Sequence, residues 1–551
     1  MRKIIIIGGV AGGATAAARL RRLDESSEII LFERGENISF ANCGLPYYIG
    51  GKITDRDELL LQTPGGFSTR LNIDVRILSE VKSIDREGKK LTVHNKMTGE
   101  SYTESYDILI LAPGGEPIKP PVEGLDSNRV FTLRSLNDAD IIKQYIASHN
   151  PKRAVVAGGG FIGIEMAENL VMAGLSVSIV ELSQQVIAPL DFDMVCDIHR
   201  YLRKKGVSLY LSSGLIKITE SGSALTAHLT NIALETDIVI LAIGVKPESL
   251  LAKDAGLSLN TRGGIITDRH MRTSDPCIYA VGDAVEVTDF VTGQSSMIPL
   301  AGPANKQARI AADNICGISS QYAGTQGSAI IKVFDMTAAF TGINEKTAVR
   351  LNLNYDKAFL WLSGHAEYYP GSLPMSIKVI FEKESGKILG AQIAGFDGTD
   401  KRCDVFAVAI RAGMTAFDLT QLELCYSPPY SSAKDPVNMA GYVIENVLTG
   451  KVKSFHWHDV DTLPRDGSVT LLDVRTPRET ARAGIDGFIS IPLDSLRERI
   501  GELDSTKPVY AMCYSGMRSY SAARILAQNG FDVYNLSGGF RLYNSVSGSS
   551  G

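Results

Sequence analysis

The chain has 551 residues, which is too long for one hydrophobic core and predicts three or four domains. Its hydrophobic content of 44% and charged content of 21% are typical of a folded globular protein and argue against disorder. The net charge of −5 argues against a nucleic-acid or anionic-membrane partner, because both need clustered positive charge. No apolar run approaches the roughly 20 residues of a membrane span, so we expect a cytoplasmic protein.

The N-terminal residues 2–33 are predicted to form a strand, a glycine-rich turn, a helix and a second strand, and the same order returns at residues 153–181. In each unit an acidic residue, Glu33 or Glu181, follows the first glycine by more than 20 residues. Glycines let the backbone approach a pyrophosphate, the helix N-terminus offers N–H donors, and the carboxylate accepts from ribose hydroxyls. The pattern predicts two Rossmann-like dinucleotide sites, although Val10 replaces the middle glycine of the first turn.

The predicted cofactor contacts from these turns are Gly8, Val10, Ala11, Gly13 and Glu33 in the first unit, and Gly158, Gly160, Gly163 and Glu181 in the second. Glu181 is followed by Leu182, Ser183 and Gln184, with no arginine to bind a 2′-phosphate. The sequence therefore favours NADH over NADPH as the ligand of the second unit.

The rest of the chain changes pattern twice. Residues 325–450 are predicted to form an α+β domain, residues 451–465 a polar linker, residues 466–545 a new α/β domain, and residues 546–551 a disordered tail. The seven cysteines are odd in number, widely separated and lack zinc-binding spacing, so we expect neither a disulfide scaffold nor a metal site. Cys43 and Cys513 stand in unusual local sequences and are the candidate reactive thiols.

Two motifs in the N-terminal 450 residues carry a resemblance to a known group of enzymes. Residues 39–48, Ser-Phe-Ala-Asn-Cys-Gly-Leu-Pro-Tyr-Tyr, and residues 273–283, Thr-Ser-Asp-Pro-Cys-Ile-Tyr-Ala-Val-Gly-Asp, resemble the redox-cysteine and second flavin motifs of the coenzyme A-disulfide reductase, NADH oxidase and persulfide reductase group of flavin disulfide reductases. The resemblance implies an FAD-binding domain in two parts, residues 1–150 and 271–324, an NAD(H)-binding domain at 151–270 and dimerisation through 325–450. It places Asp283 on the ribityl chain of FAD and adds the cofactor contacts Arg34, Asn42, Val81 and Ala301.

The same resemblance makes Cys43 the catalytic thiol. Dithiol relatives carry a second cysteine five residues later, where this chain has Tyr48. The second sulfur must then come from a small thiol or persulfide such as coenzyme A, bound as a substrate or as a tightly held ligand. Ala11 stands where peroxidase and oxidase relatives have a histidine, which disfavours peroxide reduction.

Coenzyme A carries phosphates, so its site needs local cations. Arg19 and Arg22 lie on one face of the first predicted helix. By resemblance the coenzyme A contacts are Thr15, Arg19, Arg22, Ser39, Asn42, Asn305 and Lys434. The resemblance also makes Tyr368 and Tyr426 catalytic residues supplied by a partner subunit, so that active sites are shared within a homodimer.

Residues 469–545 resemble a single rhodanese domain. The loop from Cys513 to Arg518 has the six-residue length associated with sulfur transfer, and it is predicted to surround the cysteine with backbone N–H donors. By resemblance Cys513 is catalytic, Arg518 contacts the substrate, and Asp473 and Arg475 support the loop.

These predictions describe an FAD- and NADH-dependent reductase of coenzyme A persulfide or coenzyme A disulfide, joined to a sulfurtransferase centre at Cys513. A pure coenzyme A-disulfide reductase, an NADH oxidase and a sulfur-carrier or redox-sensing interaction protein remain alternatives. Fusion to a rhodanese domain favours the persulfide, although the direction of sulfur flow stays open.

Overall fold

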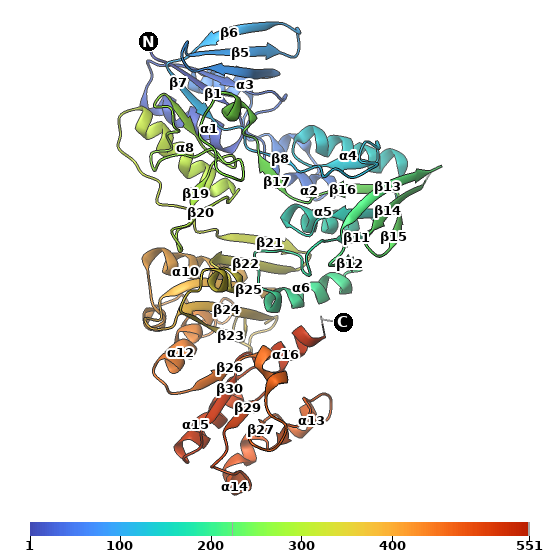
Figure 1. Ribbon diagram of the computed structural model, residues 1–551, viewed down its shortest axis with the longest axis vertical. Coiled ribbons are helices and arrows are strands. Elements are labelled where there is room, and N and C mark those ends of the chain that lie inside the picture. The colour runs from blue at the N-terminus through green and yellow to red at the C-terminus, as the bar shows by residue number, and fades with distance from the viewer. Residues whose placement is uncertain (223, 549–551) are drawn as a thin grey trace. The chain divides into compact units, whose positions relative to one another are not determined.

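A computed structural model describes residues 1–222 and 224–548, and its chain divides into two compact units. The first unit comprises Met1–Val186 and Gly206–Gly327, and the second comprises Ile187–Lys205 and Ser328–Gly551, apart from the few residues outside the described ranges. Figure 1 shows the ribbon with its element labels. Among the described residues, no helix is long and apolar enough to cross a membrane.

The first unit contains two parallel sheets of the dinucleotide-binding kind. One has the order β18-β7-β1-β2-β3, formed by Ile278–Ala280, Ile108–Leu111, Lys3–Ile7, Glu28–Phe32 and Asp74–Arg76. The other has the order β12-β11-β10-β16-β9, formed by Ser208–Tyr210, Ser176–Val180, Arg153–Ala157, Ile238–Leu241 and Val130–Thr132. Apolar runs such as Ile4–Ile6 are fully buried, as expected for parallel strands covered on both faces.

The helices that follow the two glycine turns are α1, Ala11–Leu23, and α5, Phe161–Met172. Small residues on α1 let it pack closely against α8, Ala301–Ile315, which comes from the end of the first unit. Two antiparallel sheets extend the unit, one from β4 (Ser79–Asp85), β5 (Lys90–Asn95) and β6 (Ser101–Ser105), the other from β13 (Leu215–Ser221), β14 (Ala224–Leu229) and β15 (Ala233–Thr236).

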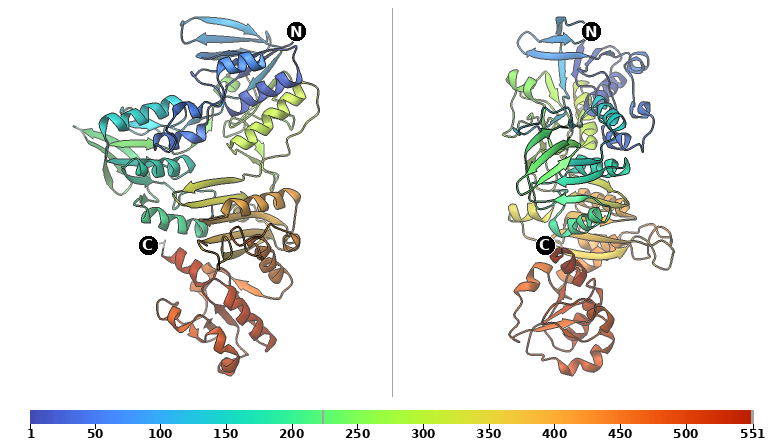
Figure 2. Two further views of the ribbon diagram at one scale, coloured as in Figure 1. Left: turned by 180° about the vertical axis from the view of Figure 1, so that it is seen from behind. Right: turned by 90° about the vertical axis from the view of Figure 1, so that its right-hand side faces the viewer.

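The second unit begins with an antiparallel sheet of order β21-β22-β25-β24-β23. Its strands are Ala329–Val333, Met336–Gly342, Ile388–Gly395, Pro374–Glu382 and Tyr355–Ser363. Helices α10, Thr399–Ala412, and α12, Pro436–Leu448, pack with it (Figure 2). The α/β architecture predicted from the sequence is confirmed by these sheets.

Helix α6, Phe192–Lys204, differs from the expectation of one continuous domain at 151–270, because it belongs to the second unit. The fully buried ammonium of Lys378 on β24 explains this: it lies 3.0 Å from Asp191, 2.9 Å from Asp193 and 2.6 Å from Glu345. A buried charge is tolerated only when paired, so these carboxylates fix the start of α6 on the antiparallel sheet.

The C-terminal sheet has the order β26-β30-β29-β27-β28, with strands Lys453–Phe455, Val533–Leu536, Val509–Met512, Thr470–Asp473 and Ile489–Ser490. Strand β26 falls within the segment expected to be a linker and instead pairs with β30. Helix α16, Gly539–Ser547, includes Val546 and Ser547 of the predicted disordered tail, because the Val546 side chain is buried. The remainder of that predicted tail, residues 549–551, lies outside the described residues.

Candidate functional sites

The first glycine turn has the shape that a bound pyrophosphate requires. Gly8 has a φ of +98°, and a Cβ atom on Gly13 would lie 1.8 Å from the carbonyl oxygen of Gly8. Val10 precedes α1 without capping it through its side chain, and Ala11 is the first helical residue. The Glu33 carboxylate accepts from the backbone N–H of Gly9 at 2.9 Å and of Gly35 at 2.8 Å, which fixes it beside the turn.

The other predicted flavin contacts come from several elements of the first unit. Asp283 follows β18, and burial raises the pKa of its carboxyl group. This carboxylate makes no hydrogen bond with another described residue, which leaves it available to the hydroxyls of a ribityl chain. Val81 lies on β4 and Ala301 begins α8, whose N-terminus no side chain caps. These residues and the tight turn fit an FAD molecule.

Arg34 is less available than expected. Its guanidinium forms an ion pair with Glu248, at 2.8 Å between Nη2 and Oε2, and Glu248 also pairs with Arg134. The sequence could not show this pair, because 214 residues separate its members.

The second glycine turn repeats the first. Gly158 has a φ of +111°, and a Cβ atom on Gly163 would lie 1.9 Å from the carbonyl oxygen of Gly158. A Cβ atom on Gly160, by contrast, would meet nothing within 4 Å, so this glycine faces open space at the start of α5. Glu181 accepts from the N–H of Gly159 at 2.7 Å. The site fits NAD(H).

Cys43 lies in a one-turn segment, Asn42–Gly44, directly before the short helix α2, Leu45–Ile49. Cys43 is exposed to solvent on one side and packed against protein on the other. This partial burial is the main cause of the raised pKa of the thiol, and the negative charges of Glu165 and Asp283 raise the pKa further. Tyr48, at the position of the absent second cysteine, is buried and donates to Asp140 at 3.1 Å. Nearby protein charge therefore does not activate Cys43, and its thiol is free, without a disulfide to another described cysteine.

Glu165 on α5 is a neighbour of Cys43 that the sequence did not reveal. Burial is the main cause that raises the pKa of Glu165 to about 7, and the negative charge of Glu168 adds to it. A hydrogen bond from Tyr47 lowers the pKa in part. Glu165 and Glu168, two glutamates on a mainly apolar helix, are the signal that the sequence offers, but 122 residues separate Cys43 from Glu165 in the chain.

The raised pKa of Glu165 makes stability depend on pH. The protonated carboxyl favours the folded state below pH 4.5, the ordinary pKa, and this contribution is lost as the pH rises through about 7. A Glu165→Gln variant stays neutral, so we expect its Tm to exceed that of the wild type by about 2–4 °C at pH 8 and by less at pH 5. Thermal unfolding at both pH values, beside the exposed control Glu58→Gln, tests this; an equal difference at both pH values would contradict it.

Several predicted coenzyme A contacts meet at the packed helices α1 and α8. The Thr15 hydroxyl donates to the side-chain oxygen of Asn305 at 2.8 Å, although 290 residues separate them. Arg22 is exposed, whereas Arg19 forms an ion pair with Asp313 at 2.8 Å. An anion at this place would compete with Asp313 for Arg19. Ser39, in the left-handed region with a φ of +47°, donates its backbone N–H to Gly9, which joins the Cys43 segment to the first glycine turn.

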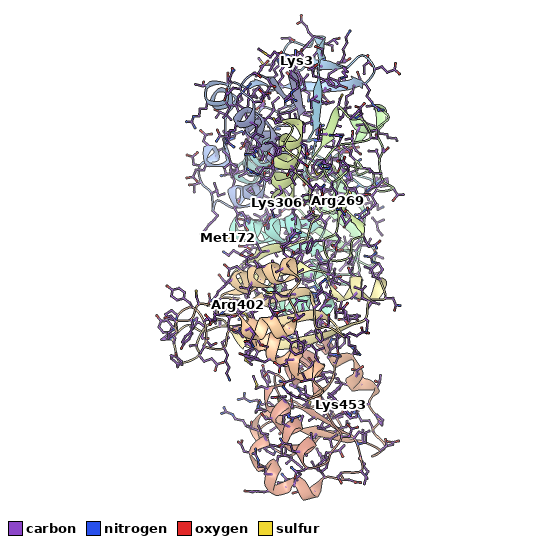
Figure 3. The ribbon with its side chains drawn as sticks, turned by 90° about the vertical axis from the view of Figure 1, so that its left-hand side faces the viewer. Lys3, Met172, Arg269, Lys306, Arg402 and Lys453 are labelled. Atoms are coloured by element: carbon purple, nitrogen blue, oxygen red, sulfur yellow. The ribbon has the colours of Figure 1, made fainter. Side chains whose placement is uncertain are left out.

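The second unit holds the predicted tyrosines and Lys434. Tyr368 and Tyr426 lie hydroxyl to hydroxyl at 2.8 Å and, with Lys434, line a cavity of about 370 Å³. Tyr368 is 75% exposed and Tyr426 47% exposed, which is unusual for large aromatic side chains. Arg402, labelled in Figure 3, is fully buried and pairs with Asp435 at 3.0 Å, which anchors the segment that carries Lys434.

The loop after β29 encloses Cys513. The Cys513 sulfur accepts from the N–H of Gly516 at 3.1 Å and from the hydroxyl of Ser519 at 3.3 Å, and it is 1% exposed. Gly516, with a φ of +97°, makes the turn that directs this N–H inwards. Such donors favour a thiolate or a persulfide anion.

The residues that support this loop are also present. Arg475 and Asp473 are buried and paired at 2.6 Å. Arg518, expected to contact the substrate, is instead held by Glu479 through two hydrogen bonds of 2.7 and 2.6 Å. The sequence does not reveal the roles of Ser519 and Glu479, because these roles depend on the folded loop.

Comparison with known proteins identifies the protein family to which the chain belongs. Residues 2–308 match the pyridine nucleotide-disulphide oxidoreductase family, residues 328–436 match its dimerisation domain, and residues 457–545 match the rhodanese-like domain. The chain belongs to the pyridine nucleotide-disulphide oxidoreductase family, whose cofactors are FAD and NAD(H).

Three relatives show which members of this family the chain resembles. The reduced CoADR-RHD of Bacillus anthracis is 51% identical with a TM-score of 0.97, covering 99% of this chain and 98% of that one. The NAD-dependent persulfide reductase from A. fulgidus is 37% identical with a TM-score of 0.91, covering 98% and 100%. The coenzyme A disulfide reductase of Staphylococcus haemolyticus is 37% identical over 80% of this chain and 99% of its own length. The predicted resemblance to the coenzyme A-disulfide and persulfide reductases is confirmed.

Proposed function

We propose that the chain reduces coenzyme A persulfide with NADH and that Cys43 is the thiol that takes the sulfur. The observation that supports this most directly is that Cys43 is exposed while Tyr48, buried and hydrogen-bonded, occupies the position of a second cysteine. A disulfide partner must therefore enter as a small molecule.

In the proposed reaction, coenzyme A persulfide, NADH and a proton give coenzyme A, hydrogen sulfide and NAD⁺. The Cys43 sulfur attacks the outer sulfur of the persulfide, the S–S bond breaks, and coenzyme A leaves as a thiolate. FAD, when bound, would supply the two electrons needed to release hydrosulfide from Cys43, and NADH would be their source. Gly8, Gly13, Glu33 and Asp283 would hold the FAD, and Gly158, Gly160, Gly163 and Glu181 the NADH.

The coenzyme A would lie along α1 and α8, with Arg19 and Arg22 towards its phosphates and Thr15, Ser39, Asn42 and Asn305 along its length. Of the two arginines, only Arg22 is unpaired among the described residues, so we assign the first phosphate contact to it. Arg19 would exchange Asp313 for phosphate on binding.

The experiment that tests this function is anaerobic turnover of coenzyme A persulfide beside coenzyme A disulfide. We expect one sulfide released for each NADH consumed with the persulfide, at a higher kcat/KM than with the disulfide. If only the disulfide is turned over, the chain is a disulfide reductase and the persulfide reaction is refuted.

We also propose a homodimer in which the partner subunit's Tyr368 and the partner subunit's Tyr426 complete each Cys43 site. Both hydroxyls are exposed in the single chain and share a hydrogen bond, so one can donate a proton to the leaving thiolate while the other supports it. The adjacent Lys434 would face the same ligand.

Mixed dimers test the shared site. A Cys43→Ser subunit and a Tyr368→Phe, Tyr426→Phe subunit should each be at least about 100-fold less active as homodimers. A purified heterodimer of the two should regain about half of the wild-type sulfide release, because one site then combines an intact Cys43 with intact tyrosines. No gain over the two parents would show that each site lies within one subunit.

For the C-terminal domain, we propose sulfane-sulfur transfer at Cys513. The hydrogen bonds from Gly516 and Ser519 to its sulfur support this role, because they stabilise negative charge on the terminal atom of a cysteine thiolate. Coenzyme A persulfide is the proposed link between Cys513 and Cys43.

A further inference from the structure

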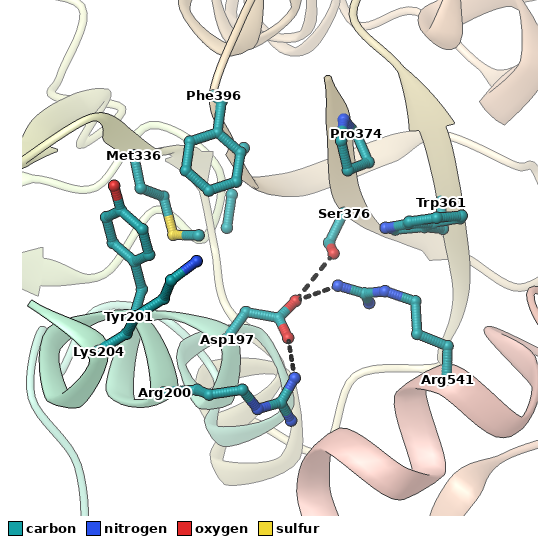
Figure 4. Close-up of a pocket in the computed structure, with 12 residues that line it drawn as sticks. Asp197, Arg200, Tyr201, Lys204, Met336, Trp361, Pro374, Ser376, Phe396 and Arg541 are labelled. Atoms are coloured by element: carbon teal, nitrogen blue, oxygen red, sulfur yellow. Dashed lines mark hydrogen bonds and ion pairs between the residues drawn. The ribbon is translucent and has the colours of Figure 1, made fainter. Parts of the chain in front are cut away.

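A cavity of about 170 Å³ in the second unit belongs to neither thiol site. It lies where α6, the antiparallel sheet and α16 meet, and Figure 4 shows the side chains that surround it. The lining residues that matter for its chemistry are Asp197, Arg200, Lys204, Trp361, Ser376 and Arg541.

The cavity carries a surplus of positive charge. Three cationic side chains and a single carboxylate, that of Asp197, line it. Asp197 is already engaged: it accepts from Ser376 at 3.1 Å, forms a close ion pair with Arg541 and lies 3.6 Å from Arg200 (Figure 4). Two positive charges therefore remain without a counter-ion inside the cavity.

Lys204 is the most available of these cations. Its ammonium makes no hydrogen bond or ion pair with another described residue, whereas Arg200 also donates to Ser545 at 3.1 Å. In Figure 4 the Lys204 side chain points from α6 towards the space that Asp197 and Tyr201 flank. A ligand with acceptor oxygens would find donors from Lys204, Arg200 and Arg541 converging on one volume.

The cavity adjoins the loop that encloses Cys513. Trp361, on β23, forms an edge-to-face contact with Tyr514 at 5.4 Å and lies 5.2 Å from the guanidinium of Arg541. The backbone N–H of Arg541 also donates to the carbonyl of Tyr514 at 2.9 Å. Since Tyr514 directly follows Cys513, two cavity-lining residues contact the sulfurtransferase loop.

We propose that this cavity binds a small, doubly charged oxyanion group. The surplus of two positive charges matches a dianion, and arginine and lysine donors suit the oxygens of sulfur oxyanions and phosphates. The volume is below the roughly 300–1,000 Å³ of sites that enclose a drug-sized ligand, so a whole nucleotide does not fit inside. The ligand is either a free sulfur oxyanion or inorganic phosphate, or the terminal phosphate of a larger molecule that extends outside.

The two tryptophans of the chain, Trp361 and Trp457, provide the measurement. In a Trp457→Phe protein, all tryptophan fluorescence comes from Trp361 on the cavity wall. This protein, with its flavin, is titrated with thiosulfate, sulfite, inorganic phosphate and adenosine 3′,5′-bisphosphate at constant ionic strength, and calorimetric titration of the unmodified protein provides a second readout.

We expect a saturable change in Trp361 fluorescence with half-saturation at or below about 1 mM for at least one of these four anions. Lys204→Ala should weaken that binding about tenfold, because one charge-assisted contact is lost, while Arg203→Ala, which removes the same charge from the neighbouring exposed position, should not. Tighter binding of the bisphosphate would identify the phosphate of a larger molecule as the source, and equal or tighter binding of the small anions would identify a free oxyanion.

The proposal is overturned if neither fluorescence nor calorimetry shows saturable binding of any of the four, or if Lys204→Ala and Arg203→Ala weaken it equally. Because binding is measured without NADH or persulfide, this outcome is independent of whether the proposed reductase activity is found.

Discussion

Replacing Cys43 by serine should abolish NADH-dependent sulfide release, with a loss of at least about 1,000-fold, while thiosulfate-to-cyanide sulfur transfer continues. The reason is that a serine hydroxyl neither attacks sulfane sulfur nor carries it as a persulfide. Replacing Cys513 by serine should have the reverse effect, because the Gly516 and Ser519 donors would then surround an oxygen that cannot accept sulfur.

Both activities are measured on each purified variant, with flavin absorbance as the check that the cofactor is retained. Cys316→Ser is a suitable control for the loss of a thiol, since this partly buried cysteine lies at the end of α8 and belongs to neither proposed thiol site. Loss of both activities in either variant would contradict independent chemical centres and would favour direct sulfur passage between the two cysteines as an obligatory step.

Replacing Gly13 by alanine should remove the flavin. The added Cβ would lie 1.8 Å from the Gly8 carbonyl oxygen, so α1 must move away from the turn that is proposed to hold the pyrophosphate. We expect at least tenfold less bound FAD, measured from the flavin absorbance of purified protein, and a lower Tm.

The second turn offers a matched comparison. Gly163→Ala should lower the Tm and weaken NADH binding, because the Cβ would lie 1.9 Å from the Gly158 carbonyl oxygen, while FAD is retained. Gly160→Ala meets open space, so it should weaken NADH binding with little change in Tm. If Gly160→Ala leaves the KM for NADH unchanged, the assignment of this turn to the NADH pyrophosphate is wrong.

Local motifs explain what the sequence could predict. Both glycine turns, the segment around Cys43 and the Cys513 loop are runs of a dozen residues or fewer, in which spacing alone specifies the backbone. The fold class followed from the same runs, because a strand, a glycine turn and a helix in sequence define a parallel α/β unit.

Partners distant in the chain explain what the sequence could not predict. Arg19 pairs with Asp313, Arg34 with Glu248 and Glu479 with Arg518, across 294, 214 and 39 residues. Arginines that the sequence predicts to bind anions are thus partly neutralised in the fold. Helix α6 belongs to the second unit because Asp193 pairs with the buried Lys378. The sequence does not show that this lysine is buried.

The strand order of the first sheet has a consequence for synthesis on the ribosome. Strand β7 ends at Leu111, but its outer neighbour β18 starts only at Ile278. At about 5–20 residues per second, the edge of β7 waits roughly 8–35 s for its partner. During that interval a nascent chain exposes an apolar strand edge of the kind that promotes intermolecular pairing. Chains that terminate within the interval should therefore aggregate, and chaperone engagement should be greatest while the predicted NAD(H)-binding domain, residues 151–270, is being made.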